Sequence, residues 1–395
     1  LVKNGFNVVL SSKVVPTPVV AYCAKYYPDS IGAIMLTASH NPKEYQGIKF
    51  IPNYGGPATK EITDEILKYV DKIVPVENPE FPKGKLEIKD LEEDYFKHLE
   101  KIIDFNLIRK NQPKIIYDGL FSSSIGYFDK LLEKNGINFK SFNMFHSSDF
   151  GGGLPEPKAK FMKHVEAGYI TVANDGDADR YGVIDENGEY VSPNIILALL
   201  LKYLHNKKLK GSMVKTVGVS AIVDVVAKKL GINVITTPVG FKWLSEGMRN
   251  NETILAGEDS GGLSTGNHIP EKDGLFANLL ILEMLAFENK TLSELKKELK
   301  EFAGCEFYTD RVDVKIETNE LLKALEDKFS NFTKIGEFEI VQKQTLDGTK
   351  LFLDNGLSWI LIRKSGTEPL LRFYIESENA EKLQKIKSFI QKETK

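Results

Sequence analysis

Four short apolar segments of this chain each run directly into a small polar loop that carries glycine or serine. The segments and loops are "IGAIML" into "TASHN" from Ile31, "YITVA" into "NDGDADR" from Tyr169, "TILA" into "GEDSGG" from Thr253, and "SWILI" into "RKSGTEP" from Ser358. In open α/β sheets, ligands bind beyond the carboxyl ends of the strands. Four such loops therefore predict separate structural units that converge on one central cleft.

Short apolar runs alternate with longer stretches of helical period, which is typical of βα units with parallel sheets. The expected strands include residues 6–10, 114–118, 169–173 and 232–237. The expected helices include residues 58–74, 122–136 and 219–231, the last two with serines at the start and a glycine at the end. After about Gly304 the strands lengthen, which indicates a separate α+β domain.

The chain of 395 residues is long enough for two to four packed domains. A proline-containing stretch at 74–85, a new helix after Ser192 and the change of pattern near Gly304 mark three boundaries. We therefore expect domain 1 at residues 1–83, domain 2 at 84–190, domain 3 at 191–303 and domain 4 at 304–395.

Composition excludes several classes of function. A net charge of -3 provides no overall basic field for nucleic acid or an anionic membrane, so an anionic substrate must be held by local lysines and arginines. No apolar run reaches transmembrane length. The two cysteines, Cys23 and Cys305, are too few for a disulfide framework, which fits a cytoplasmic location.

The loop "DGDADR" predicts a metal site. Asp175, Asp177 and Asp179 alternate in a tight turn and supply the hard oxygen ligands that Mg²⁺ or Ca²⁺ prefers. An EF-hand loop is the alternative, but Arg180 occupies the sixth position, where that loop needs glycine, and the flanking segments have strand character. A cation beside a metal cluster indicates that a phosphate bridges the two.

The loop "RKSGTEP" predicts a phosphate site. Arg363, Ser365, Gly366 and Thr367 combine charge, hydroxyl groups and a backbone that can turn several N–H groups toward one anion, and Arg372 follows on the next strand. A plain hairpin turn is the alternative. With "DGDADR", one loop would bind a metal ion and the other a phosphate.

Two loops also permit a different reaction class. "DSGG" at residues 259–262 and "LTASHN" at 36–41 have the order of nucleophile and histidine segments in trypsin-like serine proteases, which makes a triad of His40, an aspartate and Ser260 a second hypothesis. The α/β periodicity opposes it, and so does Leu263 after the glycines. A serine at a strand end that faces metal-binding aspartates can instead carry a phosphoryl group, which makes Ser39 the reactive residue.

The segments "TASHNPKEYQGIKF", "DGDADR", "GEDSGG" and "RKSGTEP", in this order, resemble those of the α-D-phosphohexomutases, the phosphoglucomutase/phosphomannomutase superfamily. The resemblance extends from near Val14 to the C-terminal helix. It implies three similar α/β domains with mostly parallel mixed sheets, a C-terminal α+β domain, and an active site in the central cleft. It also implies interconversion of glucose or mannose 1-phosphate and 6-phosphate, with hexose 1,6-bisphosphate as intermediate and activator.

The resemblance further implies roles for single residues. Ser39 is similar to the serine that is phosphorylated and that binds Mg²⁺ together with Asp175, Asp177 and Asp179. Arg180 is expected beside the phosphoserine, and His40 and Lys49 are expected to assist proton transfer, with Lys49 as the general base. The expected substrate contacts are Glu258 and Ser260 in the sugar-binding loop, Lys242, His268 and Lys272, and the phosphate-binding residues Arg363, Ser365, Gly366, Thr367 and Arg372.

Two features depart from the family pattern. Members normally have an arginine in an N-terminal strand and turn near the active serine, whereas the first arginine here is Arg109, so we expect domain 1 to be N-terminally incomplete. The residues after the serine of "GEDSGG" also differ from those of many relatives, which leaves phosphoglucosamine mutase as an alternative. The expected partner is a small phosphosugar, and the expected assembly is a monomer or a homodimer.

Overall fold

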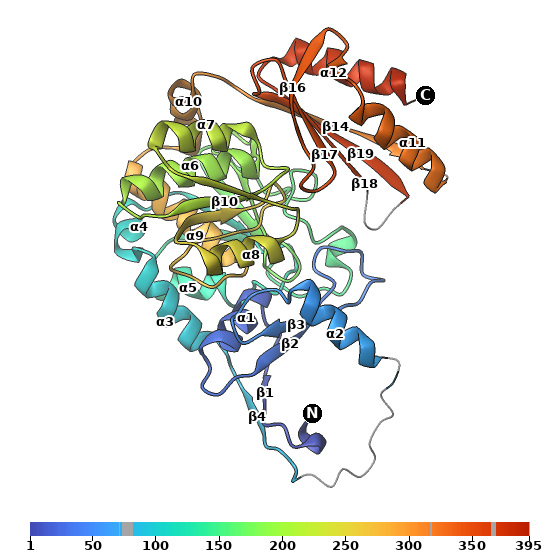
Figure 1. The fold of residues 1–395 in the computed structure, drawn as a ribbon. Coiled ribbons are helices and arrows are strands. Elements are labelled where there is room, and N and C mark those ends of the chain that lie inside the picture. The colour runs from blue at the N-terminus through green and yellow to red at the C-terminus, as the bar shows by residue number, and fades with distance from the viewer. Residues whose placement is uncertain (71, 73–81, 317, 365–368, 395) are drawn as a thin grey trace.

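The computed structural model describes residues 1–70, 72, 82–316, 318–364 and 369–394. In Figure 1, residues 1–70 and 82–89 lie at one end of the molecule, the C-terminal sheet lies at the other end, and two further sheets with their helices lie between them. None of the helices in these ranges is long and apolar enough to cross a membrane.

The first part of the chain contains two small sheets. A short 3₁₀ helix, η1 (Val2–Asn4), precedes β1 (Val8–Ser11), which pairs in parallel with β4 (Leu86–Lys89), and β2 (Gly32–Leu36) pairs antiparallel with β3 (Ile48–Pro52). Helix α1 (Thr17–Tyr26) packs against β2 and β3 through Val20, Ala21 and Ala24. Helix α2 (Lys60–Val70) is amphipathic in sequence, yet none of its residues is buried.

The next sheet has five strands in the order β6-β5-β7-β8-β9. Strand β5 (Ile115–Asp118) lies parallel to β6 (Phe139–Phe142) and β7 (Ile170–Asn174), whereas β8 (Tyr181–Ile184) and β9 (Tyr190–Val191) are antiparallel additions. The other elements of this region are α3 (Glu92–Ile102), α4 (Phe105–Asn111), α5 (Phe128–Lys134) and η2 (Phe150–Gly152). The loop between β7 and β8 holds the three aspartates.

The third region has a sheet in the order β11-β10-β12-β13. Its strands are β10 (Ser212–Thr216), β11 (Val234–Thr237), β12 (Thr253–Gly257) and β13 (Leu263–Ser264), and its helices are α6 (Pro193–Asn206), α7 (Ala221–Leu230), α8 (Phe241–Asn250), α9 (Gly274–Glu288) and α10 (Leu292–Ala303). Strand β10 lies parallel to β11 and β12.

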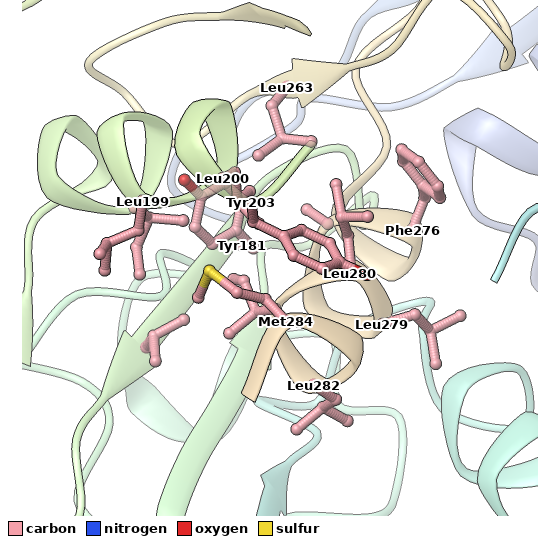
Figure 2. Packing of buried hydrophobic residues seen from close by; sticks show 14 of the residues in the cluster. Tyr181, Leu199, Leu200, Tyr203, Leu263, Phe276, Leu279, Leu280, Leu282 and Met284 are labelled. Atoms are coloured by element: carbon pink, nitrogen blue, oxygen red, sulfur yellow. The ribbon is translucent and has the colours of Figure 1, made fainter. Parts of the chain in front are cut away.

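Helix α9 joins the two central regions through one hydrophobic core. It is apolar on nearly all sides, and residues Gly274 to Ala286 are all buried, as expected of a helix that has protein on every face. Figure 2 shows Leu280 and Met284 of α9 beside Tyr181 of β8 and Leu200 of α6. This shared core fixes the loop after β7 relative to the loop after β12.

The C-terminal region has a sheet and a core of its own. All six strands are antiparallel in the order β14-β19-β18-β17-β16-β15. The strands are β14 (Tyr308–Lys315), β15 (Lys334–Ile335), β16 (Phe338–Gln344), β17 (Thr349–Leu353), β18 (Ser358–Lys364) and β19 (Leu370–Ser377), and the helices are α11 (Asn319–Ser330) and α12 (Ala380–Glu393). Phe329, Phe373 and Ile386 lie at the centre of this core. The expected fold class, three α/β units followed by an α+β unit, is confirmed.

Two local expectations had different outcomes. Helix α7 begins after its N-cap Ser220 and ends at Gly231, which has φ 69°, as the sequence predicts. The helix expected from Ser122 is wrong in its first turns, since α5 begins only at Phe128. The Ser124 hydroxyl lies 2.6 Å from Tyr117 Oη and 2.5 Å from Ser122 Oγ, so these serines stabilise the loop after β5 rather than a helix start.

Candidate active site

The loop between β7 and β8 gathers three buried carboxylates. The backbone N–H of Arg180 donates to Asp175 Oδ1 (3.0 Å) and closes the turn, and Ala178 has φ 59°. One oxygen from each of Asp175, Asp177 and Asp179 lies within 4.8 Å of the others. Each of these side chains also has one buried carboxylate oxygen without a hydrogen-bond partner among the described residues.

Such an oxygen is costly unless a cation takes the place of the missing donor. Three carboxylates that each keep one unused oxygen fit a hard divalent cation such as Mg²⁺. Burial and the charges of Asp179 and Asp177 raise the pKa of Asp175 well above its usual range. The carboxylate cluster is therefore unfavourable without nearby positive charge.

Two lysines supply part of that charge. Lys49 Nζ donates to Asp177 Oδ2 (2.8 Å) and Asp179 Oδ2 (3.2 Å), and Lys272 Nζ forms an ion pair with Asp179 Oδ2. Burial opposes ionisation of Asp179, but Lys272 and Lys49 outweigh it and lower the pKa of that carboxyl. Burial likewise opposes the charge of Lys49, and Asp179 and Asp177 raise the pKa of its ammonium above its usual value. A general base must be unprotonated when it accepts a proton, so this raised pKa opposes the general-base role that was expected of Lys49.

Ser39 lies directly against the aspartate loop. It follows β2 with φ 56°, and its backbone N–H donates to Thr37 Oγ1 (2.8 Å). A Cβ atom added at Gly176 would lie 2.6 Å from the Ser39 carbonyl oxygen, which is closer than such contacts allow. Glycine at 176 thus permits the two loops to meet, although they are far apart in the sequence.

The His40 ring connects Ser39 to Arg180. Arg180 Nη1 lies 2.9 Å from His40 Nδ1, and Ser39 Oγ lies 3.3 Å from the same nitrogen. A guanidinium can only donate, so Nδ1 is the acceptor and the proton of the neutral ring is on Nε2, which lies 3.8 Å from Glu156 Oε1. Burial, and then Arg180, lower the pKa of His40 to about 4. His40 is therefore neutral, and the one lone pair of its Nδ1 accepts from Arg180 in this arrangement, so the Ser39 hydroxyl and Arg180 compete for the same nitrogen.

The loop between β12 and β13 lies beside the aspartate loop. The backbone N–H of Tyr181 donates to the Gly261 carbonyl (3.1 Å), and burial raises the pKa of the Glu258 carboxyl. Ser260 Oγ is 3.5 Å from Glu258 Oε2. A Cβ atom at Gly262 would lie 2.7 Å from Cδ of Lys272, so glycine lets the lysine pass to the aspartates.

His268 lies elsewhere than its expected role requires. Its Nε2 bonds to Asp273 Oδ2 (2.8 Å) and its Nδ1 to His98 Nε2 (2.9 Å), and its side chain is fully buried. Both ring nitrogens are used inside the protein, so His268 supports packing around the start of α9 rather than reaching the four loops. Lys242, near the start of α8, is half-buried beside the Trp243 ring.

The fourth loop is described only at its two ends. Ser365, Gly366 and Thr367 lie outside the described residues, whereas Arg363 on β18 and Arg372 on β19 are cross-strand partners. Arg363 Nη2 donates to Asp347 Oδ2 (3.0 Å). Arg363 also opposes the effect of burial on the pKa of Asp259 in the β12–β13 loop, as Arg180 does, so its charge faces that loop.

Sequence reasoning missed Thr17 and Asp347. Thr17 Oγ1 donates to Asp177 Oδ2 (2.8 Å), and its backbone N–H donates to the Asp177 carbonyl (2.9 Å), which ties the start of α1 to the aspartate loop. The one available signal was that Thr17 also follows a strand, β1, across a proline-containing loop. The protease hypothesis fails on geometry, because His40 contacts Ser39, Arg180 and Glu156, while Ser260 donates to Glu258.

This fold brings a serine of the first region against an arginine and a carboxylate cluster of the second, which is the arrangement expected of the class of phosphohexomutases. Comparison with known proteins supports the same class. Models of phosphoglucomutase/phosphomannomutase domains I, II, III and IV match residues 1–76, 93–188, 192–302 and 312–393. The chain belongs to the phosphoglucomutase/phosphomannomutase family, as the motifs predict.

Individual relatives agree on the family but differ in named substrate. The chain is 32% identical to the phosphoglucosamine mutase of Methanocaldococcus jannaschii, over 95% of this chain and 83% of that protein. It is 31% identical to a phosphoglucomutase/phosphomannomutase of Thermococcus kodakarensis, over 97% of this chain and 82% of that protein. The crystal structure of a putative phosphomannomutase from Thermus thermophilus superposes with a TM-score of 0.84 at 30% identity, over 99% of this chain and 84% of that one.

Proposed function

We propose that this protein interconverts hexose 1-phosphate and hexose 6-phosphate, with glucose or mannose as the sugar, through a phosphoserine at Ser39 and a hexose 1,6-bisphosphate intermediate. The observation that carries the proposal is the meeting of Ser39, His40 and Arg180 against a loop of three carboxylates with unused oxygens. This arrangement provides a nucleophile, a proton acceptor, a cation for phosphate and a cation site within one small volume.

The carboxylates of Asp175, Asp177 and Asp179 would hold Mg²⁺, with Ser39 as a further ligand, and the ion would supply charge neutralisation at the transferring phosphoryl group. In the first transfer, the bond from phosphorus to Ser39 Oγ breaks and a bond to the sugar 6-oxygen forms. The 6-hydroxyl loses one proton and Ser39 Oγ gains one, so a side chain that donates its proton to Ser39 can then take up the proton of the 6-hydroxyl and return to its starting state. Lys49, which is protonated here, is suited to that donation.

In the second transfer, a bond forms from Ser39 Oγ to the phosphorus of the 1-phosphoryl group, the bond from that phosphorus to the sugar 1-oxygen breaks, and the 1-oxygen takes up the proton that Ser39 releases. The hydroxyl proton of Ser39 can pass to the neutral His40 Nδ1, 3.3 Å away, once the Arg180 guanidinium leaves that nitrogen for the phosphoryl oxygens. Arg180 bonds to the same nitrogen of His40, so its guanidinium is close enough to pair with the negative charge of the new phosphoserine. Glu258 and Ser260 are proposed to bind sugar hydroxyls, and Arg363, Arg372 and the loop between them to hold the phosphate that does not react.

A second substrate is supported by one observation. The Methanocaldococcus relative is named a phosphoglucosamine mutase, and it is as similar to this chain as the relative named phosphoglucomutase/phosphomannomutase. Glucosamine 1-phosphate is therefore the alternative substrate at the same site.

Phosphorus NMR tests the proposal directly. The protein, Mg²⁺ and a trace of glucose 1,6-bisphosphate are incubated in parallel with glucose 1-phosphate, mannose 1-phosphate or glucosamine 1-phosphate. A 6-phosphate signal with glucose or mannose is expected, and its absence from Ser39→Ala supports the phosphoserine. Conversion of glucosamine 1-phosphate alone would favour the alternative, and no conversion of any sugar would contradict the mutase reaction.

A further inference from the structure

Asp347 lies where the C-terminal sheet meets the third region. It occupies the turn between β16 and β17, and a single oxygen, Oδ2, accepts two hydrogen bonds. One comes from Arg363 Nη2 at 3.0 Å and the other from the backbone N–H of Val239 at 2.8 Å. Val239 precedes α8, the helix that carries Lys242 near its start. One carboxylate oxygen therefore joins the end of β18 to the segment that leads into α8.

The turn is shaped to lie against Arg363. Gly348 has φ 76°, a conformation that favours glycine. A Cβ atom there would lie 2.8 Å from Arg363 Cγ and 2.1 Å from the Ile362 carbonyl oxygen. The turn thus packs closely along the arginine side chain, and Asp347 holds the guanidinium at its far end. Among the described residues, Arg363 Nε is buried without a hydrogen-bond partner, while Nη2 of the same guanidinium bonds to Asp347.

Other groups already hold the two regions together. Lys350 Nζ donates to the Val217 carbonyl (2.8 Å), and Glu376 Oε1 accepts from the Ala221 N–H (2.7 Å) at the start of α7. Trp359 packs against Val217 and Ala221. We call these contacts between the C-terminal sheet and the third region the seam. These contacts hold the two regions together without Asp347. The link from Arg363 to Val239 through a charged side chain therefore indicates a more specific role for Asp347.

We propose that Asp347 is a positioning residue. It orients the Arg363 guanidinium toward the non-reacting phosphate of the substrate and fixes the position of that guanidinium relative to the start of α8. The proposal rests on the proposed function, in which Arg363 binds that phosphate. Asp347 acts entirely through Arg363. Because the phosphate is held in the ground state and the transition state alike, the contribution of Asp347 falls on KM more than on kcat.

The test is a double-mutant cycle with a conservative rescue. Asp347→Ala is expected to raise KM for glucose 1-phosphate about tenfold with kcat changed less than about threefold, as loss of one charge-assisted hydrogen bond implies. Asp347→Asn keeps an oxygen that accepts from Val239 and Arg363, so it should recover most of the affinity. On an Arg363→Ala background, Asp347→Ala should have no further effect. Asp310→Ala, which removes the ion pair with Lys387 (2.7 Å) in the same region, is the matched control.

Several outcomes would overturn the proposal. These are an unchanged or lowered KM in Asp347→Ala, a loss in Asp347→Asn equal to that in Asp347→Ala, or additive effects of Asp347→Ala and Arg363→Ala. Calorimetric titration with glucose 1-phosphate of the same variants, each combined with Ser39→Ala, gives the affinities without turnover. Failure of the proposed function would appear separately, as a wild-type protein that produces no 6-phosphate signal, and the binding cycle would still decide the role of Asp347.

Discussion

At the scale of single residues, the three aspartates are expected to lower the stability of the ion-free protein and to raise it when an ion is bound. Burial and the neighbouring carboxylates Asp179 and Asp177 raise the pKa of Asp175, so its ionised form is costly without a cation. We expect Asp175→Asn to be at least as stable as the wild type in the absence of Mg²⁺ and to lose its response to the ion. The wild type should gain about 2.7 kcal/mol when free Mg²⁺ is about a hundredfold above its dissociation constant.

Thermal unfolding with and without MgCl₂ measures both effects. Asp310→Asn, in the C-terminal region, should keep the full response to the ion. A wild-type melting temperature that does not depend on Mg²⁺ would count against the aspartate loop as the ion site. So would an unchanged response in Asp175→Asn.

The contact between Gly176 and Ser39 gives a second prediction. Gly176→Ala should reduce kcat at least about tenfold, because a Cβ atom 2.6 Å from the Ser39 carbonyl must displace the serine loop from the aspartates. Gly153→Ala is the matched control, since its added Cβ comes no closer than 3.4 Å to its neighbours. Steady-state kinetics of the two variants decide the matter, and equal activities would show that the loops need not meet this closely.

The strand-end loops made much of this site predictable, since Ser39 and the three aspartates follow apolar runs in the sequence. Thr17 and Asp347 were not predictable. Thr17 bonds to a residue 160 positions away, and Asp347 receives its bonds from residues that precede and follow it on other elements. A single sequence contains no information about such pairings. His268 had a motif-based role, but a neighbouring histidine and Asp273 take up both of its ring nitrogens.

At the scale of elements, the start of the chain exposes more apolar surface than the rest. Leu36 of β2 and Ile48 of β3 are cross-strand partners, and they are 71% and 76% exposed. On α2, Leu67 is 58% exposed, and Ile66 and Val70 are exposed as well. Exposed apolar side chains in such number promote association between molecules.

We therefore expect concentration-dependent self-association that involves α2. Leu67→Glu should weaken it about tenfold, because burial of a leucine side chain contributes about 1.5–3 kcal/mol when complete. Lys68→Glu changes the charge of an adjacent exposed position on the same helix and should have little effect. Sedimentation velocity over a range of concentrations provides the measurement, and equal behaviour of the two variants would place the association elsewhere.

Helix α5 begins later than its sequence predicts, which shows that local sequence signals alone do not determine a helix start. The serines at 122–124 are good N-cap residues, but Gly126 has φ 81°, the Ser124 hydroxyl bonds to Tyr117 of β5, and the Ser122 hydroxyl bonds to that of Ser124. Tertiary contacts thus decided the helix start, while the periodic positions of Leu131 and Leu132 fixed its buried face. The Ser220 hydroxyl at the start of α7 accepts from a backbone N–H of the helix itself, and both caps of α7 lie where the sequence predicts them.

At the scale of the whole molecule, the seam at the C-terminal sheet contains a lysine that responds to pH. Burial, and then Lys215, lower the pKa of Lys350 to about 7, against a smaller opposing effect of Glu376, Asp224 and Asp259. Its ordinary value is 10.5. Between these values the unfolded chain binds the proton more tightly than the folded one, so this group makes folding more favourable as pH rises.

Lys350→Met should remove that dependence. The free energy of unfolding of the wild type should rise with pH between 7 and 10 relative to the variant, by at most about 1.4 kcal/mol per pH unit. Urea unfolding at pH 7, 8 and 9, followed by fluorescence of Trp359 in the seam, gives the two slopes. Lys387→Met, on the outer helix α12, should keep the wild-type slope, and parallel slopes for wild type and Lys350→Met would contradict the pKa shift.

The two carboxylate oxygens of Asp177 have different surroundings, and this difference has a consequence for the whole molecule. Its Oδ2 accepts from Thr17 and Lys49 in the first region, while its Oδ1 is free of protein partners among the described residues. Thermodynamic reciprocity then applies: by whatever factor an ion at the aspartates changes the docking of α1 and β3, that docking changes the affinity for the ion by the same factor. If the aspartates hold a divalent cation as proposed, the region that carries Ser39 and that cation both bind the Asp177 carboxylate, so the binding of one affects the binding of the other.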